Sequence, residues 1–319
     1  MKKLFRILTV LLIALSFISC GQKATTYEAK EALSKHLVER YGEEFEIGYI
    51  GRRSDGKEVW YEAEIYPSKY VGTPKERDKY YRRSGTVNIE KGILGDRLGF
   101  VGDTYGKVKI NESAEEFYEE KLKELFGDNV LQVYDIKFNR VLKDYSFENI
   151  IKVWKEEGVR LTIIGGIYIF GRVENDEDRE WYRKQIYEFI QFMKETGTFE
   201  YVDLNFTISD ERIFSDEFYS SPKLQFDMKK FGNYIEPEGR KVILNKTNKS
   251  YKNTDKKNIL DRINSLNKGN IDSEFYGIYW LYTKIYSPKY IESHKLKNEI
   301  KKEYNSVFDI DFSVEGYKN

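Results

Sequence analysis

Hydrophobic positions change period repeatedly along the chain, from a helical spacing to a strand spacing. Between Tyr27 and Tyr41, the residues Ala29, Leu33, Leu37 and Tyr41 recur every four positions, which predicts an amphipathic helix. Thr26 is the predicted N-cap, and Gly42 is predicted to end the helix. Alternating positions then predict strands at 45–50 and 59–66, joined by a turn at Asp55-Gly56.

The same sequence of helix, stop residue and strand is predicted four more times. The stop residues are spaced irregularly, which excludes a solenoid because a solenoid needs a fixed period. Within one apolar run, Gly165-Gly166 predicts a tight hairpin, with a β-bulge as the alternative. The fold class is therefore α+β, with helices packed on mainly antiparallel sheets. The predicted helices are 113–126, 147–157, 177–195 and 293–304, and the strands are 130–138, 159–173, 199–208 and 307–314.

Length and composition suggest two domains. We place an α+β domain at 27–143 and a second at 144–319. Residues 245–258 contain four Asn and five Lys and are predicted to form a solvated, protease-sensitive loop in the second domain.

The first 21 residues carry an export pattern. Lys2, Lys3 and Arg6 form a basic start, and Leu4–Ile18, interrupted by Arg6, Thr9 and Ser16, is an apolar run that is too short to span a membrane. The run ends at Ser19-Cys20, which resembles the lipobox of bacterial lipoproteins. This resemblance implies cleavage of residues 1–19, a lipid on Cys20, and a short tether at 20–26. The expected location is the cell membrane or envelope, because a diacyl anchor holds a protein stably at a membrane.

Charge and cysteine content exclude several classes of protein. Without residues 1–19, the chain has 50 Lys+Arg and 53 Asp+Glu, which does not suit nucleic-acid binding. Cys20 is the single cysteine, so with Cys20 lipidated no thiol remains for a disulfide or a thiolate site. Residues 223–319 hold 19 basic and 13 acidic side chains. This basic region could attract the acidic remainder of the chain, or it could face anionic lipid or an anionic envelope polymer.

No catalytic or cofactor motif stands out. The two histidines, His36 and His294, lack a metal-ligand spacing and are expected to be packed or surface residues. The glycines between Gly92 and Gly106 fail the phosphate-loop pattern, since Val108 stands where Ser or Thr is required. They are interpreted as turns and a flexible loop that could fold over a ligand. The acidic run 175–178 is interpreted as helix capping rather than a calcium loop.

Two groups of aromatic side chains are the candidate binding residues. Tyr80, Tyr81, Arg82 and Arg83 combine rings with cations next to a predicted loop, which suits an anionic partner. Residues 275–286 are predicted to form an aromatic helix. On it, Tyr279 and Trp280 either pack internally or face a sugar chain, a peptide or the membrane.

Taken together, these features predict a membrane-anchored envelope lipoprotein that acts by binding a polymer or protein partner, not by catalysis. The junction Tyr41-Gly42-Glu43-Glu44-Phe45 resembles junctions in small exported proteins of low-GC bacteria, and no activity follows from it. One alternative is an envelope hydrolase acting on peptidoglycan or glycan, which would place His36 or His294 beside an acid, or two carboxylates in a pocket. The other is a substrate-binding lipoprotein of an importer, which would show repeated parallel β-α-β units.

Overall fold

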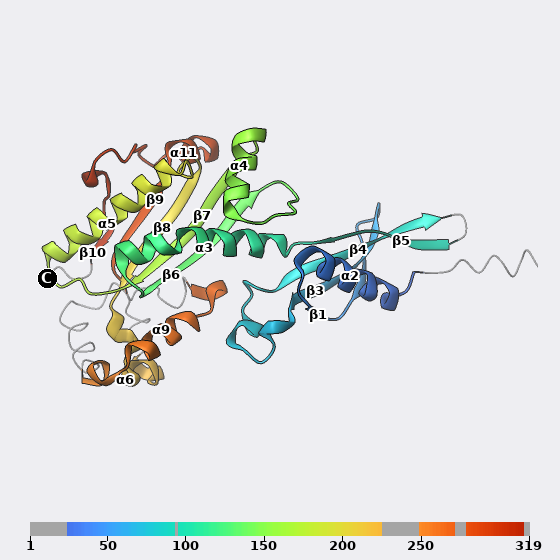
Figure 1. Ribbon diagram of the computed structural model, residues 1–319, viewed down its shortest axis with the longest axis horizontal. Coiled ribbons are helices and arrows are strands. Elements are labelled where there is room, and N and C mark those ends of the chain that lie inside the picture. Colours follow the sequence, from blue (N-terminus) through green and yellow to red (C-terminus); the bar gives the residue numbers. More distant parts are fainter. Residues whose placement is uncertain (1–23, 93–94, 225–248, 272–278, 316–319) are drawn as a thin grey trace, which may run out of the picture. The chain divides into compact units, whose positions relative to one another are not determined.

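The structure, a computed structural model, describes residues 24–92, 95–224, 249–271 and 279–315 (Figure 1). The chain divides into unit 1, residues 1–105, and unit 2, residues 106–319. The predicted signal, Cys20 and most of the predicted tether lie outside the described residues. None of the described helices is long and apolar enough to cross a membrane.

In its described part, unit 1 consists of one α-helix on an antiparallel sheet. The sheet order is β1-β3-β4-β5, and β2 pairs with β3 beside β1. The β2–β3 hairpin turns at the predicted Asp55-Gly56, where Gly56 has a φ of 90°. The elements are α2 (Thr26–Tyr41), β1 (Phe45–Ile47), β2 (Gly51–Ser54), β3 (Val59–Pro67), β4 (Arg83–Gly92) and β5 (Gly95–Asp103), with short 3-10 turns at Ser68–Tyr70 and Pro74–Arg77.

Helix α2 forms where the periodicity predicts it, and its ends have local causes. The N-cap is Thr25, one residue before the predicted Thr26, in a reciprocal capping box with Glu28. Gly42 ends the helix with a φ of 68°, a conformation that glycine adopts without strain. The buried face carries Ala29, Leu33 and Leu37. A Cβ on Gly85 would lie 2.8 Å from the Leu33 methyls, so this glycine lets the helix approach the sheet closely.

The glycines between Gly92 and Gly106 do not form the predicted loop. Strands β4 and β5 pair from Gly85↔Asp103 to Gly92↔Gly95, with a bulge between Val87 and Ile89. The predicted flexible loop is therefore wrong over this stretch. Glycine is compatible with a strand where a neighbouring side chain needs the space that a Cβ would occupy.

Unit 2 is a second five-stranded sheet with helices on both faces. The order is β10-β9-β8-β7-β6, and only β7 and β8 run parallel. The elements are α3 (Gly106–Phe126), β6 (Val130–Phe138), α4 (Phe147–Glu157), β7 (Leu161–Phe170), α5 (Asp176–Glu195), β8 (Val202–Ser209), α6 (Asp216–Tyr219), α9 (Lys256–Asn264), β9 (Tyr279–Tyr286), α11 (Pro288–His294) and β10 (Val314–Glu315), with 3-10 turns at Glu211–Phe214, Lys268–Asn270 and Val307–Asp309.

Two apolar clusters cover the two faces of this sheet. The larger cluster packs α3, α4 and α5 against alternate residues of the strands, and it includes Phe189 of α5 and Phe206 of β8, both fully buried. The smaller cluster, on the opposite face, joins Tyr168 and Phe170 of β7 to Phe214 and to Ile259 and Ile263 of α9. With both units built this way, the α+β class and the mainly antiparallel pairing are confirmed.

Three sequence-based predictions in unit 2 are wrong. Gly165 and Gly166 make no hairpin but lie inside β7, which pairs with β6 and β8 along its length. Residues 279–286 form strand β9 instead of an aromatic helix, and residues 272–278 lie outside the described part. The last helix is α11, which ends at His294, so the predicted helix 293–304 does not form. In the first two cases strand pairing outweighs the local periodicity, and in the third the helix starts at Pro288 instead.

Smaller differences concern the ends of elements. Helix α3 begins at Gly106, so Ser113 is an interior residue that bonds to the Ile110 carbonyl instead of capping the helix. Of the predicted strand 307–314, only its last residue is in a strand, β10. The predicted loop 245–258 lies partly outside the described residues, and α9 begins within it, at Lys256.

The division between the units also differs from the predicted boundary at 143/144. It falls between Tyr105 and Gly106. Strand β6, which the prediction placed in the first domain, pairs with β7 over all nine of its residues. Helix α3 packs on β6, so both elements belong to unit 2, which contains the second sheet.

Candidate functional site

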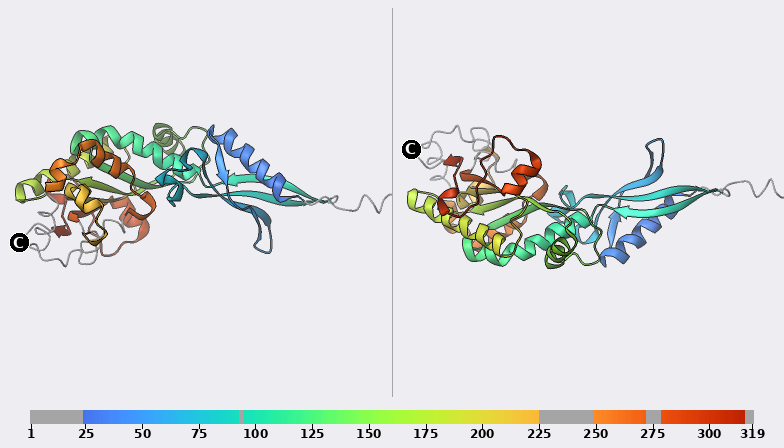
Figure 2. Two further views of the ribbon diagram at one scale, coloured as in Figure 1. Left: turned by 90° about the horizontal axis from the view of Figure 1, so that it is seen from below. Right: turned by 90° about the horizontal axis from the view of Figure 1, so that it is seen from above.

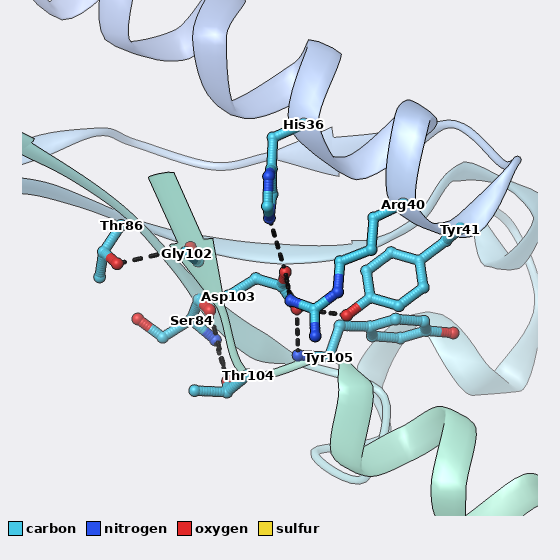
Figure 3. A network of polar contacts seen from close by, with 9 residues as sticks. All are labelled: His36, Arg40, Tyr41, Ser84, Thr86, Gly102, Asp103, Thr104 and Tyr105. Carbon is cyan, nitrogen blue, oxygen red and sulfur yellow. Dashed lines mark hydrogen bonds and ion pairs between the residues drawn. The ribbon is translucent and has the colours of Figure 1, made fainter. Parts of the chain in front are cut away.

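A buried carboxylate in unit 1 gathers the densest set of polar contacts that involves a histidine (Figure 3). Asp103 Oδ2 lies 3.0 Å from His36 Nε2 and accepts from Arg40 Nη1 at 2.6 Å. Its Oδ1 accepts from the Tyr41 hydroxyl at 2.6 Å and from the Tyr105 amide at 2.8 Å. We call these five residues the Asp103 cluster.

Two elements position the Asp103 cluster. Asp103 ends β5, with its side chain on the sheet face that α2 covers, because its partner Gly85 faces Leu33. His36 and Arg40 are four positions apart on α2, one turn above each other on the same side. The Asp103 side chain has no exposed surface, whereas those of His36 and Arg40 are 27% and 20% exposed.

An aspartate beside a histidine can orient the imidazole for acid–base work. In this cluster, however, the carboxylate also accepts from a guanidinium, a hydroxyl and a backbone amide. The neighbouring hydroxyls are engaged elsewhere, since Ser84 donates to Glu62 at 2.8 Å and Thr86 lies 3.4 Å from the Gly102 carbonyl. The arrangement therefore has an acid and a base in contact, and it also fastens the C-terminal half of α2 to β5.

The sequence did not single out Asp103 or Arg40, and it placed Tyr41 on the apolar face of the first helix instead of in a polar site. Asp103 lies more than 60 residues from its three side-chain partners, so no local spacing connects them. The sequence predicts His36 to be a packed or surface residue, and its acidic neighbour emerges only from the fold. His294, by contrast, stacks on Tyr290 at 4.0 Å and contacts the Tyr290 carbonyl and Ser293.

The Tyr80–Arg83 group does not form an exposed aromatic surface. Tyr80 and Tyr81 are 7% and 2% exposed, and the Tyr81 ring packs on Tyr70 at 4.6 Å. The Arg82 guanidinium lies over the Tyr66 ring at 4.6 Å and pairs with Glu64, while that of Arg83 lies over Tyr80 at 5.8 Å. Of the four, only the arginines reach the surface of unit 1.

Tyr279 and Trp280 lie in unit 2, on β9, whereas Tyr80–Arg83 lie in unit 1. Trp280 is 8% exposed and its indole donates to Asp210 Oδ2 at 3.2 Å. Asp210, directly after β8, is also held by Arg212 through both carboxylate oxygens. Tyr279 packs its ring near Tyr282 at 5.6 Å. The indole thus supports a buried ion pair.

A second polar group, missed by the sequence analysis, surrounds the carboxyl ends of the parallel strands β7 and β8. Arg172 pairs with Glu211 at 3.2 Å and lies over the Tyr251 ring at 5.3 Å. Burial raises the pKa of Tyr182, and the carboxylates of Glu211, Asp178 and Asp210 raise it further. Ligands of open α/β sheets bind at such ends, but here the charged groups pair with one another. Among the described residues, no three His, Cys, Asp or Glu side chains are placed to hold a metal ion.

The outer face of the unit 1 sheet, opposite α2, is covered by no helix among the described residues of this unit. Its side chains alternate with the buried ones along β3 and β4, and the described helix of this unit packs on the other face only (Figure 2). We call this face the outer lane. Its residues are Trp60, Glu62, Glu64 and Tyr66 of β3, Ser84, Thr86 and Asn88 of β4, and Phe100 of β5.

Comparisons with known proteins identify no family for the chain. No family model matches, and no curated protein matches. Among solved structures, the chain is similar to a DUF5037 family protein from Ruminococcus gnavus, with 14% identity and a TM-score of 0.31 over 56% of this chain and 73% of that one. At that level of similarity, the functional conclusions rest on this chain's own residues.

Proposed function

We propose that the chain is a lipid-anchored protein of the bacterial cell envelope that acts by binding a partner at the membrane surface. The observation that carries this proposal is a hydrogen bond from the Tyr61 hydroxyl to the Ala24 carbonyl, 2.7 Å long. It fastens the chain to the sheet of unit 1 only four positions after Cys20, the residue that the lipobox pattern marks for lipidation.

The distance from lipid to fold is short under this proposal. Only residues 21–23 separate Cys20 from Ala24, and three extended residues reach roughly 10 Å. The capping box at Thr25 begins α2 directly afterwards, which supports a stiff attachment. Unit 1 is then held close to the bilayer. Its outer lane offers a surface for a partner there, whereas the Asp103 carboxylate is engaged in holding the fold.

Cys20→Ala is expected to abolish lipidation and to leave the protein unprocessed or released from the membrane. Fractionation of cells, with labelling by a radioactive fatty acid, measures this outcome directly. Tyr27→Ala is the matched control, because Tyr27 is 69% exposed at the start of α2 and has no part in the anchor. Unchanged labelling and membrane retention of the Cys20→Ala variant would refute the anchor.

The second candidate function is an envelope hydrolase, and the 3.0 Å contact between His36 and Asp103 favours it. In that case His36→Ala should lower the release of soluble fragments from purified peptidoglycan by at least about 100-fold, the usual size of acid–base catalysis. His294→Ala is the control, since His294 contacts no carboxylate among the described residues. Equal release by His36→Ala and the unaltered protein would exclude His36 as the base.

A further inference from the structure

The outer lane carries aromatic rings at its two ends. Trp60 and Tyr66 are six positions apart on the same side of β3, roughly 20 Å along the strand. Phe100 lies two strands away from Trp60, across Asn88, at a distance of roughly 10 Å. Trp60 and Tyr66 are half-buried, while Phe100 is 72% exposed.

Gly102 lets the Phe100 ring lie along the sheet. A Cβ on Gly102 would be 2.8 Å from a Phe100 ring atom and 3.5 Å from the Thr86 hydroxyl oxygen. Since glycine leaves that space open, the ring extends over β5 beside Thr86 instead of standing away from it. An exposed phenylalanine in this position presents an apolar surface next to a hydrogen-bonding group.

Between the rings, the lane carries polar groups in register. Asn88 is opposite Trp60, Thr86 is opposite Glu62, and Ser84 is opposite Glu64. The Ser84 hydroxyl donates to Glu62 at 2.8 Å, which fixes the orientation of that carboxylate. Amide, hydroxyl and carboxylate groups thus line the strip between Trp60 and Tyr66, and they both donate and accept hydrogen bonds.

The lane is electrically balanced. Glu62 lies 3.8 Å from Arg53, and Glu64 pairs with Arg82, whose guanidinium also covers the Tyr66 ring. Both carboxylates of the lane therefore have their own cation. A polyanion would have to compete with Glu62 and Glu64 for these arginines, whereas an uncharged ligand would leave the pairs intact.

We propose that the outer lane binds an uncharged glycan chain. Sugar rings have apolar C–H faces that pack on aromatic rings, and they carry hydroxyls around the edge that bond to amides, hydroxyls and carboxylates. The rings of Trp60 and Phe100, the polar groups beside them and the absence of net charge match that chemistry along an extended chain, while the Tyr66 ring at the far end is covered by Arg82. This inference deepens the proposed function and rests on it, because it names the partner that unit 1 would meet near the membrane.

Titration calorimetry on the full chain in detergent, with chitohexaose, cellohexaose and maltohexaose as separate probes, tests the inference. We expect at least one hexasaccharide to bind. Phe100→Ala should weaken that binding by at least about 10-fold, and it should leave the melting temperature unchanged because the ring is largely exposed. Trp60→Ala should weaken it similarly. Phe308→Ala is the matched control, since Phe308 is 75% exposed in unit 2, and it should bind normally.

Salt separates this proposal from binding to a polyanion. Affinity for an uncharged glycan should change less than 2-fold between 50 and 500 mM NaCl, since about 10-fold or more is expected where several ion pairs form. Binding of none of the three hexasaccharides, or equal affinity in Phe100→Ala, would overturn the inference. Retention of the chain on a heparin column would also overturn the inference, if high salt and substitution of the outer-lane residues each abolished that retention. The fractionation of Cys20→Ala reports the anchor independently, so failure here leaves that result standing.

Discussion

Asp103→Ala is expected to lower the free energy of unfolding of unit 1 by about 3 kcal/mol. The substitution removes a fully buried carboxylate that accepts from His36, Arg40, Tyr41 and the Tyr105 amide. Hydrogen bonds to a charged group contribute about 1.5–3 kcal/mol each. The loss stays well below their sum because His36 and Arg40 are partly exposed and regain water.

Urea unfolding of the full chain, followed by circular dichroism, measures this loss. Asp103→Asn keeps one carbonyl acceptor and should fall between the alanine variant and the original protein. Asp311→Ala is the control, because Asp311 forms an ion pair with Lys302 but is 76% exposed, and such pairs contribute under about 1 kcal/mol. If Asp103→Ala and Asp311→Ala unfold alike, the Asp103 cluster does not hold α2 on β5.

Gly165→Ala is expected to destabilise unit 2 by about 2 kcal/mol. A Cβ at this position would lie 2.6 Å from the Val133 carbonyl oxygen and 2.7 Å from the buried Tyr134 ring. The carbonyl belongs to the paired strand β6 and cannot move aside without breaking the register between β6 and β7. Overpacking of this kind costs about 1–3 kcal/mol.

The matched control is Gly48→Ala. Its added Cβ would be 3.4 Å from the Glu64 carbonyl oxygen, an ordinary contact, so the melting temperature should stay within about 2 °C. A melting curve of each variant makes the comparison. A Gly165→Ala variant as stable as Gly48→Ala would argue against the continuous strand β7.

Several elements could be predicted from local signals because local interactions decide them. The helix Phe147–Glu157 and the strand Val130–Phe138 have the predicted bounds. Gly42 and Gly158 end their helices with φ values of 68° and 66°, so glycine at those positions marks the boundary directly. Periodicity and stop residues are properties of neighbouring positions, and the sequence displays them without a tertiary model.

Where strand pairing competes with local pattern, the local pattern misleads. Tyr279, Tyr282 and Tyr286 recur at helical spacing, yet they lie on β9, whose alternate residues Leu281, Thr283 and Ile285 are buried. Aromatic and β-branched residues favour strands, and this segment forms a strand because it pairs with β8. Likewise, the Gly165-Gly166 pair reads as a turn until β6 and β8 close in on both sides of β7.

The sequence by itself determined the α+β class and the helix boundaries set by glycine, and it predicts the export signal that ends before Cys20. Each of these depends on residues close together in the chain. Only the tertiary structure decided which groups meet, because such contacts join residues that the chain separates by many positions. Asp103 of β5 meets His36 of the helix that covers the same face of the unit 1 sheet, and Trp60 and Phe100 come to the other face through the pairing of three strands. The candidate site residues of this protein are therefore brought together by these long-range contacts.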